Sequence, residues 1–510
     1  MAMMVAVLMS ACASLPPQAD RVATQALARQ ADTRLGNTYA AAERQHADST
    51  AMHLLPDGVD ALLARIALAE AADHSLDLQY YIWHDDLTGR HLAHALLRAA
   101  DRGVRVRLLL DDLGTNADDQ VLLALASHPN ISVRLFNPVA NRRFKRISAL
   151  VDFGRIDRRM HNKALIADNQ AAILGGRNIG DEYFGASSEV AFGDLDILMH
   201  GVVVPQVSTA FDAFWNADSA YPIERLMGRA AAADALAGYR AKLDAFVAAE
   251  RASPYVTQVG QRLAQFLDEG GVDFAWGKAT VLYDDPAKIS RAPEDTQGHL
   301  LPQLQALHVA PTRQMLVVSP YFIPGDAGVA WLRGLSERGV QVTVLTNSLA
   351  ATDVSAVHAG YQRYRKDLLA AGIHLYELKP AASDDGKAHK KSLLGSSKAS
   401  LHAKTYVFDR GSIFVGSMNL DPRSVMLNTE IGVYCESPML AGEVVDSLLP
   451  QLDRIAWRLA LRNDEQGREH IVWIDSEPGG AITERDEPEV SALRRIGIWF
   501  LSILPIESEL

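Results

Sequence analysis

The sequence predicts an α/β protein of two tandem α/β sandwich repeats, which are related by a pseudo-two-fold axis and share a site at their junction. Three observations predict this architecture. A motif containing histidine, lysine, aspartate and asparagine occurs twice with the same internal spacing. Segments outside the motif recur at a nearly constant offset along the chain. Within each copy, segments typical of strands alternate with segments typical of helices.

Each copy of the motif spells His-x-Lys, four residues, Asp, six residues, then Gly-Gly or Gly-Ser, one residue and Asn. Matching several fixed positions twice in one chain is very unlikely by chance. The residues are His161, Lys163, Asp168 and Asn178 in the first copy, and His402, Lys404, Asp409 and Asn419 in the second. The two histidines are 241 positions apart, which predicts the length of the repeat.

Segments ahead of the motif repeat at similar distances. Tyr80 corresponds to Tyr321, 241 positions later, and Gly103 corresponds to Gly339, 236 positions later. Offsets that drift by only a few residues indicate a duplication with small changes in loop length.

The elements of the first copy follow one another as strand, helix, strand, helix, strand, motif strand and its partner. Residues 76–83 are predicted to form a strand. Thr88 caps a predicted helix whose leucines lie at helical spacing, and Gly103 ends it. Residues 104–110 are mostly apolar, which predicts a buried strand. This alternation favours a largely parallel or mixed sheet in each repeat, and the two sheets are expected to pack side by side with both motif strands at their junction.

The motif residues suit the cleavage of a phosphodiester. On a strand, residues i and i+2 point to one face, so the histidine and lysine of each copy are expected to project together. Two lysines and two asparagines would hold the phosphate and its extra transition-state charge. These four are Lys163, Asn178, Lys404 and Asn419. One histidine can attack phosphorus and the other can protonate the leaving oxygen, because imidazole is a nucleophile with a pKa near neutrality.

Four carboxylates accompany the histidines. Asp168 and Asp409 belong to the motif and so to the candidate catalytic set, but on an ideal strand they face away from the lysines, which favours a structural role. Asp194 and Glu430, further downstream, are candidates for orienting the histidines through their second ring nitrogens. The alternative for both is an ordinary charge at the end of a strand.

The doubled motif is the signature of the phospholipase D superfamily, which both copies match in full. This resemblance implies a two-step transfer through a covalent phosphohistidine at a site shared by two halves, with no metal and no cofactor. It also implies that His161 is the nucleophile and His402 the general acid and base, an order that the residues alone leave open. No segment has the spacing of a metal site such as His-Glu-x-x-His.

Other segments resemble bacterial cardiolipin synthases, most closely those of the C type. They are residues 76–83, 159–163, 175–181, 284–288, 345–353, 357–361, 376–380, 419–423 and 502–505. The resemblance implies a phosphatidyltransferase that moves a phosphatidyl group from a donor phospholipid to phosphatidylglycerol, and the C type suggests phosphatidylethanolamine as the donor. A phospholipase D that hydrolyses phospholipids to phosphatidic acid is the nearest alternative. A nuclease or phosphodiesterase of the same superfamily and a non-enzymatic lipid-binding scaffold are less favoured.

The charge of the chain favours an anionic substrate bound locally. The formal net charge of −12 argues against a general nucleic-acid partner, although 48% apolar and 22% charged residues are ordinary for a globular protein. Basic residues nevertheless precede each motif. They are Arg142, Arg143, Lys145, Arg146, Arg155, Arg158 and Arg159, and Lys387, Lys390, Lys391 and Lys398. We expect them to attract phospholipid head groups at a membrane surface.

Both ends of the chain bear on its location. The apolar start before Cys12 resembles a bacterial lipoprotein signal with Cys12 as the lipidated residue, although no basic residue precedes it, and a chance cysteine in a disordered end is the alternative. Residues 496–506 are uncharged and too short to span a bilayer, which suits either an interfacial anchor or a terminal helix packed on the body. With only Cys12 and Cys435, a disulfide framework is excluded. The expected location is the bacterial cell envelope, as a peripheral or lipid-anchored protein.

The predicted organisation has five parts. They are a signal-like N-terminus and linker at 1–45, the first repeat at 46–225, a helical connection at 226–275, the second repeat at 276–470 and a C-terminal tail at 471–510.

Overall fold

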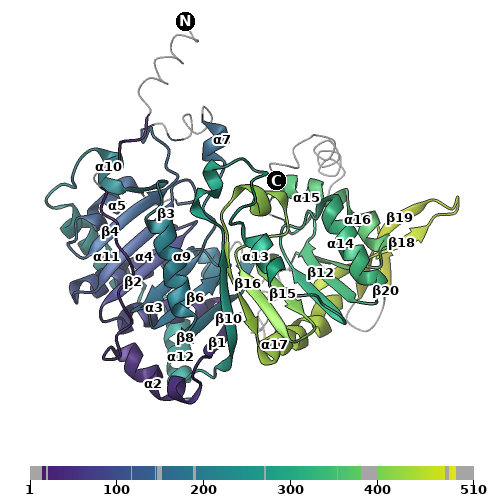
Figure 1. Cartoon of the computed structure of the whole chain (residues 1–510), viewed down its shortest axis with the longest axis horizontal. Helices are drawn as coiled ribbons and strands as arrows, with labels where there is room; N and C mark the ends of the chain where they lie inside the picture. Colours follow the sequence, from purple (N-terminus) through teal and green to yellow (C-terminus); the bar gives the residue numbers. More distant parts are fainter. Residues whose placement is uncertain are drawn as a thin grey trace, which may run out of the picture.

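The computed structural model describes residues 14–18, 21–115, 118–143, 145, 152–187, 191–268, 271–352, 354–380, 399–476 and 482–489. Its centre is one continuous mixed sheet, in which 18 strands of the described residues are joined by hydrogen bonds. Figure 1 shows the first half of the chain in purple and teal beside the second half in green and yellow, with helices on both faces. Mixed α/β architecture was expected from the alternating elements, and the fold confirms it.

The first half forms one wing of the sheet. From the outer edge inwards the strand order is β9, β4, β3, β2, β5, β6, β8 and β1, with β2, β3 and β4 parallel and the other neighbours antiparallel. The bounds are β1 Thr50–Leu55, β2 Ser75–Tyr80, β3 Arg105–Asp111, β4 Ile131–Phe136, β5 Ala164–Ala167, β6 Ala171–Gly175, β8 Asp196–Gly201 and β9 Ala220–Pro222.

The second half repeats this order. β11, β12 and β13 are parallel and correspond to β2, β3 and β4, while β15, β16, β17 and β10 correspond to β5, β6, β8 and β1. The bounds are β10 Ala275–Tyr283, β11 Gln314–Val318, β12 Gln341–Asn347, β13 His374–Leu378, β15 Lys404–Phe408, β16 Ser412–Gly416 and β17 Ile431–Glu436. Beyond β13 the sheet continues through β18 Ala456–Asn463, β19 Glu469–Ser476 and β20 Ile482–Arg485. The duplication predicted from sequence is thus a duplication of strand order.

Strand β10 joins the two halves into one sheet. Its first residues pair with β1, and the rest, from Lys278 to Tyr283, pair with β17. The two sheets were expected to pack side by side, and they do so edge to edge, as parts of one continuous sheet. A strand of nine residues is long enough to do this, because its first part pairs with one strand and its remaining part with another.

Helices cover both faces of the sheet and divide the apolar core into three clusters. α9 and α17 lie together over the central strands, and their side chains belong to one cluster that spans both halves. A second cluster lies under the helices of the first half and a third under those of the second half. The helices of the first half are α2 Arg34–Gln45, α3 Gly58–Ala71, α4 Leu87–Asp101, α5 Asp119–Ala126, α7 Phe153–Ile156, α8 Asp181–Phe184, α9 Val204–Trp215 and α10 Ile223–Met227. Those of the second half are α13 Leu300–Ala306, α14 Gly325–Glu337, α15 Ser355–Gln362, α16 Arg365–Ala370, α17 Pro438–Leu448 and α18 Leu452–Ile455, with the short turns η1 Pro286–Ser290, η2 Arg423–Leu427 and η3 Leu449–Gln451.

The segment between the repeats is helical, with α11 Ala235–Glu250 packed on α4 and α12 Pro254–Asp268 packed on α3. Among the described residues, no helix is both long and apolar enough to cross a membrane. Cys12, the basic residues from Lys387 to Lys398 and the 496–506 segment lie outside the described residues.

Candidate active site

The first motif histidine is held by the second half of the chain. The backbone N–H of His161 donates to Thr429 O at 2.8 Å, and Met160 forms a parallel bridge with Thr429. Its ring Nδ1 lies 2.9 Å from Glu430 Oε2 and 3.2 Å from Ser417 O. Glu430 is fully buried at the start of β17, so it fixes both the position and the orientation of the His161 ring.

The second motif histidine is held by the first half in the same way. β14 Ala399–Leu401 pairs with β7 Ala191–Gly193 in a small parallel sheet, and the backbone N–H of His402 donates to Gly193 O at 2.8 Å. His402 Nδ1 lies 2.6 Å from Asp194 Oδ2. Asp194 and Glu430, predicted as orienting residues, thus each contact the histidine of the opposite repeat. With Nδ1 engaged in both rings, Nε2 is the nitrogen left for chemistry.

The two motif lysines lie beside the histidines with almost no exposed surface. Lys163 Nζ donates to His161 O at 2.5 Å and lies 5.4 Å from the ring centre of Tyr81, while Lys404 Nζ donates to His402 O. Burial is the main cause of a pKa of Lys163 well below its ordinary value, and the charge of Lys404 adds to it. The two ammonium groups therefore repel each other, which favours an anion between them.

The two motif asparagines differ in what they contact. Asn178 Oδ1 accepts from Ile82 N at 3.2 Å and its Nδ2 donates to Tyr183 Oη at 2.9 Å, so this side chain holds the loop after β6. Asn419 Oδ1 is buried and has no hydrogen-bond partner among the described residues. This oxygen is an acceptor, so it can take a hydrogen bond from a hydroxyl or amine of a substrate but not from the phosphate oxygens.

Aromatic rings that sequence reasoning missed form the walls around both histidines. The Tyr81 ring centre lies 5.1 Å from that of His161, and those of Tyr183 and Phe192 each lie 5.2 Å from that of His402. Tyr81 lies at the end of a strand segment that recurs in the second repeat, and this recurrence could have marked it as a site residue. Nothing in the sequence marked the other two rings.

The electrostatics of the two histidine–carboxylate pairs are unequal. Burial raises the pKa of Glu430 to about 7, against the opposing charge of Lys163. Burial also disfavours the charge of Asp194, but His402 and Lys404 outweigh it and hold the pKa of Asp194 below its ordinary value. Both histidines have lowered pKa values, because burial and the nearby lysines disfavour the imidazolium. Only Asp194 is thus a strong, permanently charged partner.

The motif aspartates Asp168 and Asp409 lie at the far ends of β5 and β15, at positive φ angles of 52°. The carboxylate of Asp168 accepts from the backbone N–H groups of residues 73, 74 and 75, at 2.7–2.8 Å. That of Asp409 accepts from residues 312, 313 and 314 in the same way. Their inclusion among the catalytic residues is corrected: each ties the turn after the motif strand to the start of its antiparallel neighbour, β2 or β11.

Replacing Asp168 with alanine is expected to lower the free energy of unfolding by roughly 3 kcal/mol, because three backbone donors lose a charged acceptor. Asp409→Ala should cost less, since its donors lie nearer to solvent and water can replace the carboxylate. Urea unfolding measures both, and Asp168→Asn is the matched control, since asparagine tolerates positive φ and keeps one acceptor. Folded Asp168→Ala with a normal stability would contradict this structural role.

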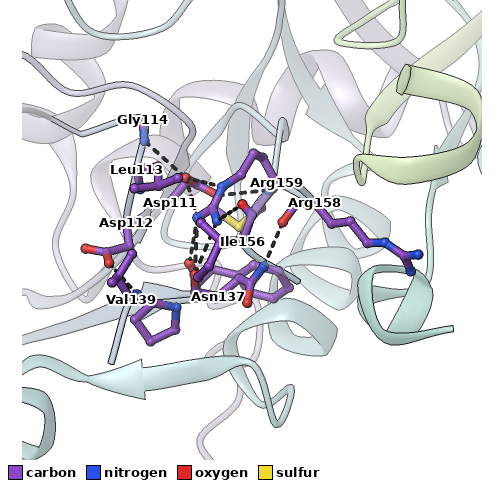
Figure 2. Close-up of polar contacts among 12 residues, drawn as sticks. Asp111, Asp112, Leu113, Gly114, Asn137, Val139, Ile156, Arg158 and Arg159 are labelled. Atoms are coloured by element: carbon purple, nitrogen blue, oxygen red, sulfur yellow. Dashed lines mark hydrogen bonds and ion pairs between the residues drawn. The ribbon is translucent and has the colours of Figure 1, made fainter. Parts of the chain in front are cut away.

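Part of the basic run ahead of His161 is neutralised by carboxylates inside the protein. Figure 2 shows the ion pair of Arg159 with Asp111. Arg159 Nη2 lies 2.7 Å from Asp111 Oδ1, and Asp111 Oδ2 also accepts from the backbone N–H of Met160 at 3.0 Å. This pair anchors the residue before His161. Arg142 lies 2.5 Å from both Asp112 and Asp119 and is almost fully buried. The expectation that Arg142 attracts an anionic surface is therefore wrong, because its charge is already matched.

One further polar cluster lies beside His402. His84 Nδ1 is 3.4 Å from Glu182 Oε1 and 3.9 Å from Asp86 Oδ2, and all three side chains are partly exposed. Among the described residues this is the one group of three with ligand atoms close enough together to hold a metal ion. Glu182 precedes Tyr183, whose ring packs on His402, so the cluster borders the site.

Comparisons with known proteins agree with this geometry. The family described as "Cardiolipin synthase, PLD-like domain" matches residues 63–215 and 304–454, one segment in each half. Cardiolipin synthase C of Escherichia coli (strain K12) is 42% identical over 91% of this chain and 97% of its own length. Cardiolipin synthase A of Pseudomonas entomophila (strain L48) is 28% identical over 79% and 68%. The crystal structure of phosphatidylserine synthase from Haemophilus influenzae Rd KW20 has the same fold, with a TM-score of 0.53 and 13% identity over 82% of this chain and 91% of that one.

Proposed function

Because the chain belongs to the family of cardiolipin synthases with phospholipase D-like domains, we propose that it makes cardiolipin by moving a phosphatidyl group from a donor phospholipid to phosphatidylglycerol. The observation that carries this proposal is the reciprocal pairing of His161 with Glu430 and of His402 with Asp194 across the junction. Such a pairing presents two Nε2 atoms to one phosphate, as a two-step displacement requires.

In the first step His161 Nε2 attacks phosphorus and forms a P–N bond while the bond from phosphorus to the donor alcohol breaks. His402, protonated, gives its proton to the leaving oxygen. Lys163 and Lys404 offset the negative charge that builds on the non-bridging oxygens. In the second step neutral His402 takes the proton of the phosphatidylglycerol hydroxyl, whose oxygen attacks phosphorus as the P–N bond breaks.

The unequal carboxylates support this assignment of roles. A general acid must exist as imidazolium, which the permanently charged Asp194 favours at His402. A nucleophile must be neutral, and burial together with Lys163 and Lys404 disfavours the imidazolium at His161. Glu430, with a pKa of about 7, is the weaker of the two anions, which suits a partner that fixes a tautomer.

Transfer is favoured over hydrolysis because the reacting groups lie in a site with little exposed surface. His402 and both lysines are buried, and aromatic rings cover the histidines. A dry site disfavours water as the acceptor and suits a hydroxyl delivered by a bound lipid. A nucleic-acid substrate remains disfavoured by the net charge of −12. Since both substrates are lipids, we place the enzyme at a membrane surface as a peripheral protein, with Cys12 as the predicted lipidation site.

The cluster of His84 and Glu182 supports a donor with an amine head group, such as phosphatidylethanolamine. In an in-line displacement the leaving oxygen departs on the side opposite the nucleophile, which is the side of His402. Burial alone would raise the pKa of Glu182, but the hydrogen bond from His84 and the charge of His402 hold it below its ordinary value. An ionised carboxylate at this place can bind an ammonium, while the lysines bind the phosphate.

Product analysis tests the proposed activity. Purified protein is incubated in mixed micelles of phosphatidylethanolamine and phosphatidylglycerol, and the lipid products are separated. Cardiolipin is the expected product. Phosphatidic acid as the dominant product would replace the transferase with a phospholipase D.

Glu182→Gln is expected to raise the KM for phosphatidylethanolamine about tenfold, because a charged hydrogen bond to the ammonium is lost. The rate with phosphatidylglycerol as the sole lipid should change much less. Glu337→Gln, at an exposed position on α14, is the matched control. An equal loss with both lipids would assign Glu182 a structural role. Loss of activity with chelator, restored by a divalent cation in wild type but not in Glu182→Gln, would instead make the cluster a metal site.

A further inference from the structure

A fully buried ion pair lies next to the backbone of Glu430 and takes no part in the mechanism above. Lys288 and Asp284 are 2% and 1% exposed, and Lys288 Nζ lies 3.1 Å from Asp284 Oδ2. Burying two charges costs free energy that a pair of apolar residues would not cost. Such a pair therefore calls for a role other than stability.

Asp284 is bonded directly to the backbone of Glu430. Its N–H donates to Glu430 O at 3.0 Å, and its Oδ2 accepts from Glu430 N at 2.8 Å. Oδ1 accepts from Leu300 N at 2.7 Å, which ties the end of β10 to α13. Lys288 in turn donates to Ser424 O at 3.0 Å. Asp284 thus fixes the backbone of Glu430, and Lys288 links Asp284 to the backbone of Ser424.

In the first half too, a buried cation lies near the carboxylate that orients a histidine. Arg177, within the first motif, is buried, and its Nη2 donates to Asp194 O at 2.8 Å. Its charge lowers the pKa of Asp194. In the second motif the corresponding residue is Met418, which carries no charge. Lys288 supplies the cation that Met418 cannot, from a turn far away in sequence.

We propose that Lys288 and Asp284 are positioning residues for the nucleophile: Asp284 fixes the backbone of Glu430, and Lys288 favours its side chain as a carboxylate aimed at His161 Nδ1. The proposal rests on the proposed function only in naming His161 as the nucleophile. A carboxylate accepts a hydrogen bond from Nδ1–H and so leaves the Nε2 lone pair free to attack phosphorus. A protonated Glu430 would donate to Nδ1 and select the tautomer whose Nε2 carries the hydrogen, which cannot attack.

The charges around Glu430 determine in which direction each substitution should shift its pKa. Positive charges come from Lys163 before β5 and Lys288 in η1, and both lower the pKa of Glu430. Negative groups facing it are Asp284 at the end of β10 and Asp421 after β16. The buried phenol of Tyr406 on β15 also faces it. Removing Lys288 should raise the pKa of Glu430 above about 7, and removing the charge of Asp284 should lower it.

The test is the pH dependence of phosphoenzyme formation, followed as the burst of alcohol released from a short-chain soluble phosphodiester. Activity should fall as the pH drops through the pKa of Glu430. In Lys288→Met this acid limb should move up by about one pH unit, which is about a fivefold loss at pH 7, about a tenfold loss below pH 6 and little loss at pH 9. In Asp284→Asn the limb should move down. Lys288→Arg should restore the wild-type limb, and Lys278→Met, on the exposed side of β10, is the matched control.

Opposite shifts in the two variants would support the proposal, because a merely structural pair would lower the rate equally at every pH. An unshifted limb in Lys288→Met that is folded by circular dichroism would overturn it. So would shifts of the same sign in both variants. The burst does not depend on which lipid product forms, so a failure of cardiolipin synthesis is distinguishable from a failure of this inference.

Discussion

Replacing His161 or His402 with alanine is expected to lower the rate of cardiolipin formation by at least about 10³-fold while leaving the protein folded. Each ring acts in both steps, so neither variant can complete a cycle. Alanine keeps the backbone N–H of each histidine, which donates to the opposite half at 2.8 Å, and loses the ring contacts to Glu430, Ser417 and Asp194. Stability should therefore change little compared with the loss of activity. His374→Ala, at an exposed position on β13, is the matched control.

Acid quenching with a labelled donor separates the roles of the two rings. Label should be trapped on His161 in the His402→Ala variant, because formation of the P–N bond needs only the nucleophile when the leaving group is good. Label on His402 in the His161→Ala variant would reverse the assignment. Full activity in either single variant would rule out the two-histidine mechanism.

Asp194→Asn is expected to lower kcat by about 10³- to 10⁴-fold with a natural lipid donor, because an amide can neither fix the required tautomer nor stabilise the imidazolium. The contact is short, at 2.6 Å, and Asp194 is fully buried, so no water can replace it. This loss of kcat is expected to exceed that of Lys288→Met, because Lys288 acts on His161 only through Glu430.

The leaving group distinguishes the two carboxylates. A donor that releases p-nitrophenol needs no proton, so the burst of Asp194→Asn should recover most of the wild-type rate with this donor. Glu430→Gln should stay impaired, since its histidine is the nucleophile whatever group leaves. If both variants recover equally, the carboxylates do not serve different roles and the assignment of the acid to His402 fails.

The repeat, the motif residues and the mixed α/β class were all predictable from the sequence, because they depend on spacing and local patterns. His161 and Lys163 lie two residues apart in the segment that leads into β5, but the regular strand begins only at Ala164. The predicted strand at 76–83 ends at Tyr80, and the chain then turns to place Tyr81 against His161. Local patterns mark an element well and its last residues poorly.

The contacts between the two repeats could not be predicted from local sequence patterns. Asp194 and Glu430 were found as candidates, yet the sequence could not indicate that each would serve the other repeat's histidine. The pairing of Arg142 with Asp112 and Asp119 depends on three loops that only the fold brings together. A charged run looks alike in sequence whether solvent or a buried carboxylate neutralises it. Asp284 and Lys288 belong to a segment that resembles cardiolipin synthases, but only the structure places Asp284 against the backbone of Glu430.

The reciprocal exchange of carboxylates has a consequence for how such an enzyme could arise. Two identical single-repeat chains related by a two-fold axis would present two identical histidine–acid pairs, and neither ring could be specialised. In one covalent chain the two copies are free to diverge. Here one copy offers aspartate backed by Arg177 and the other offers glutamate backed by Lys288. Fusion thereby permits a division of labour, in which one imidazole is tuned to carry the lipid phosphate and its twin to shuttle the proton.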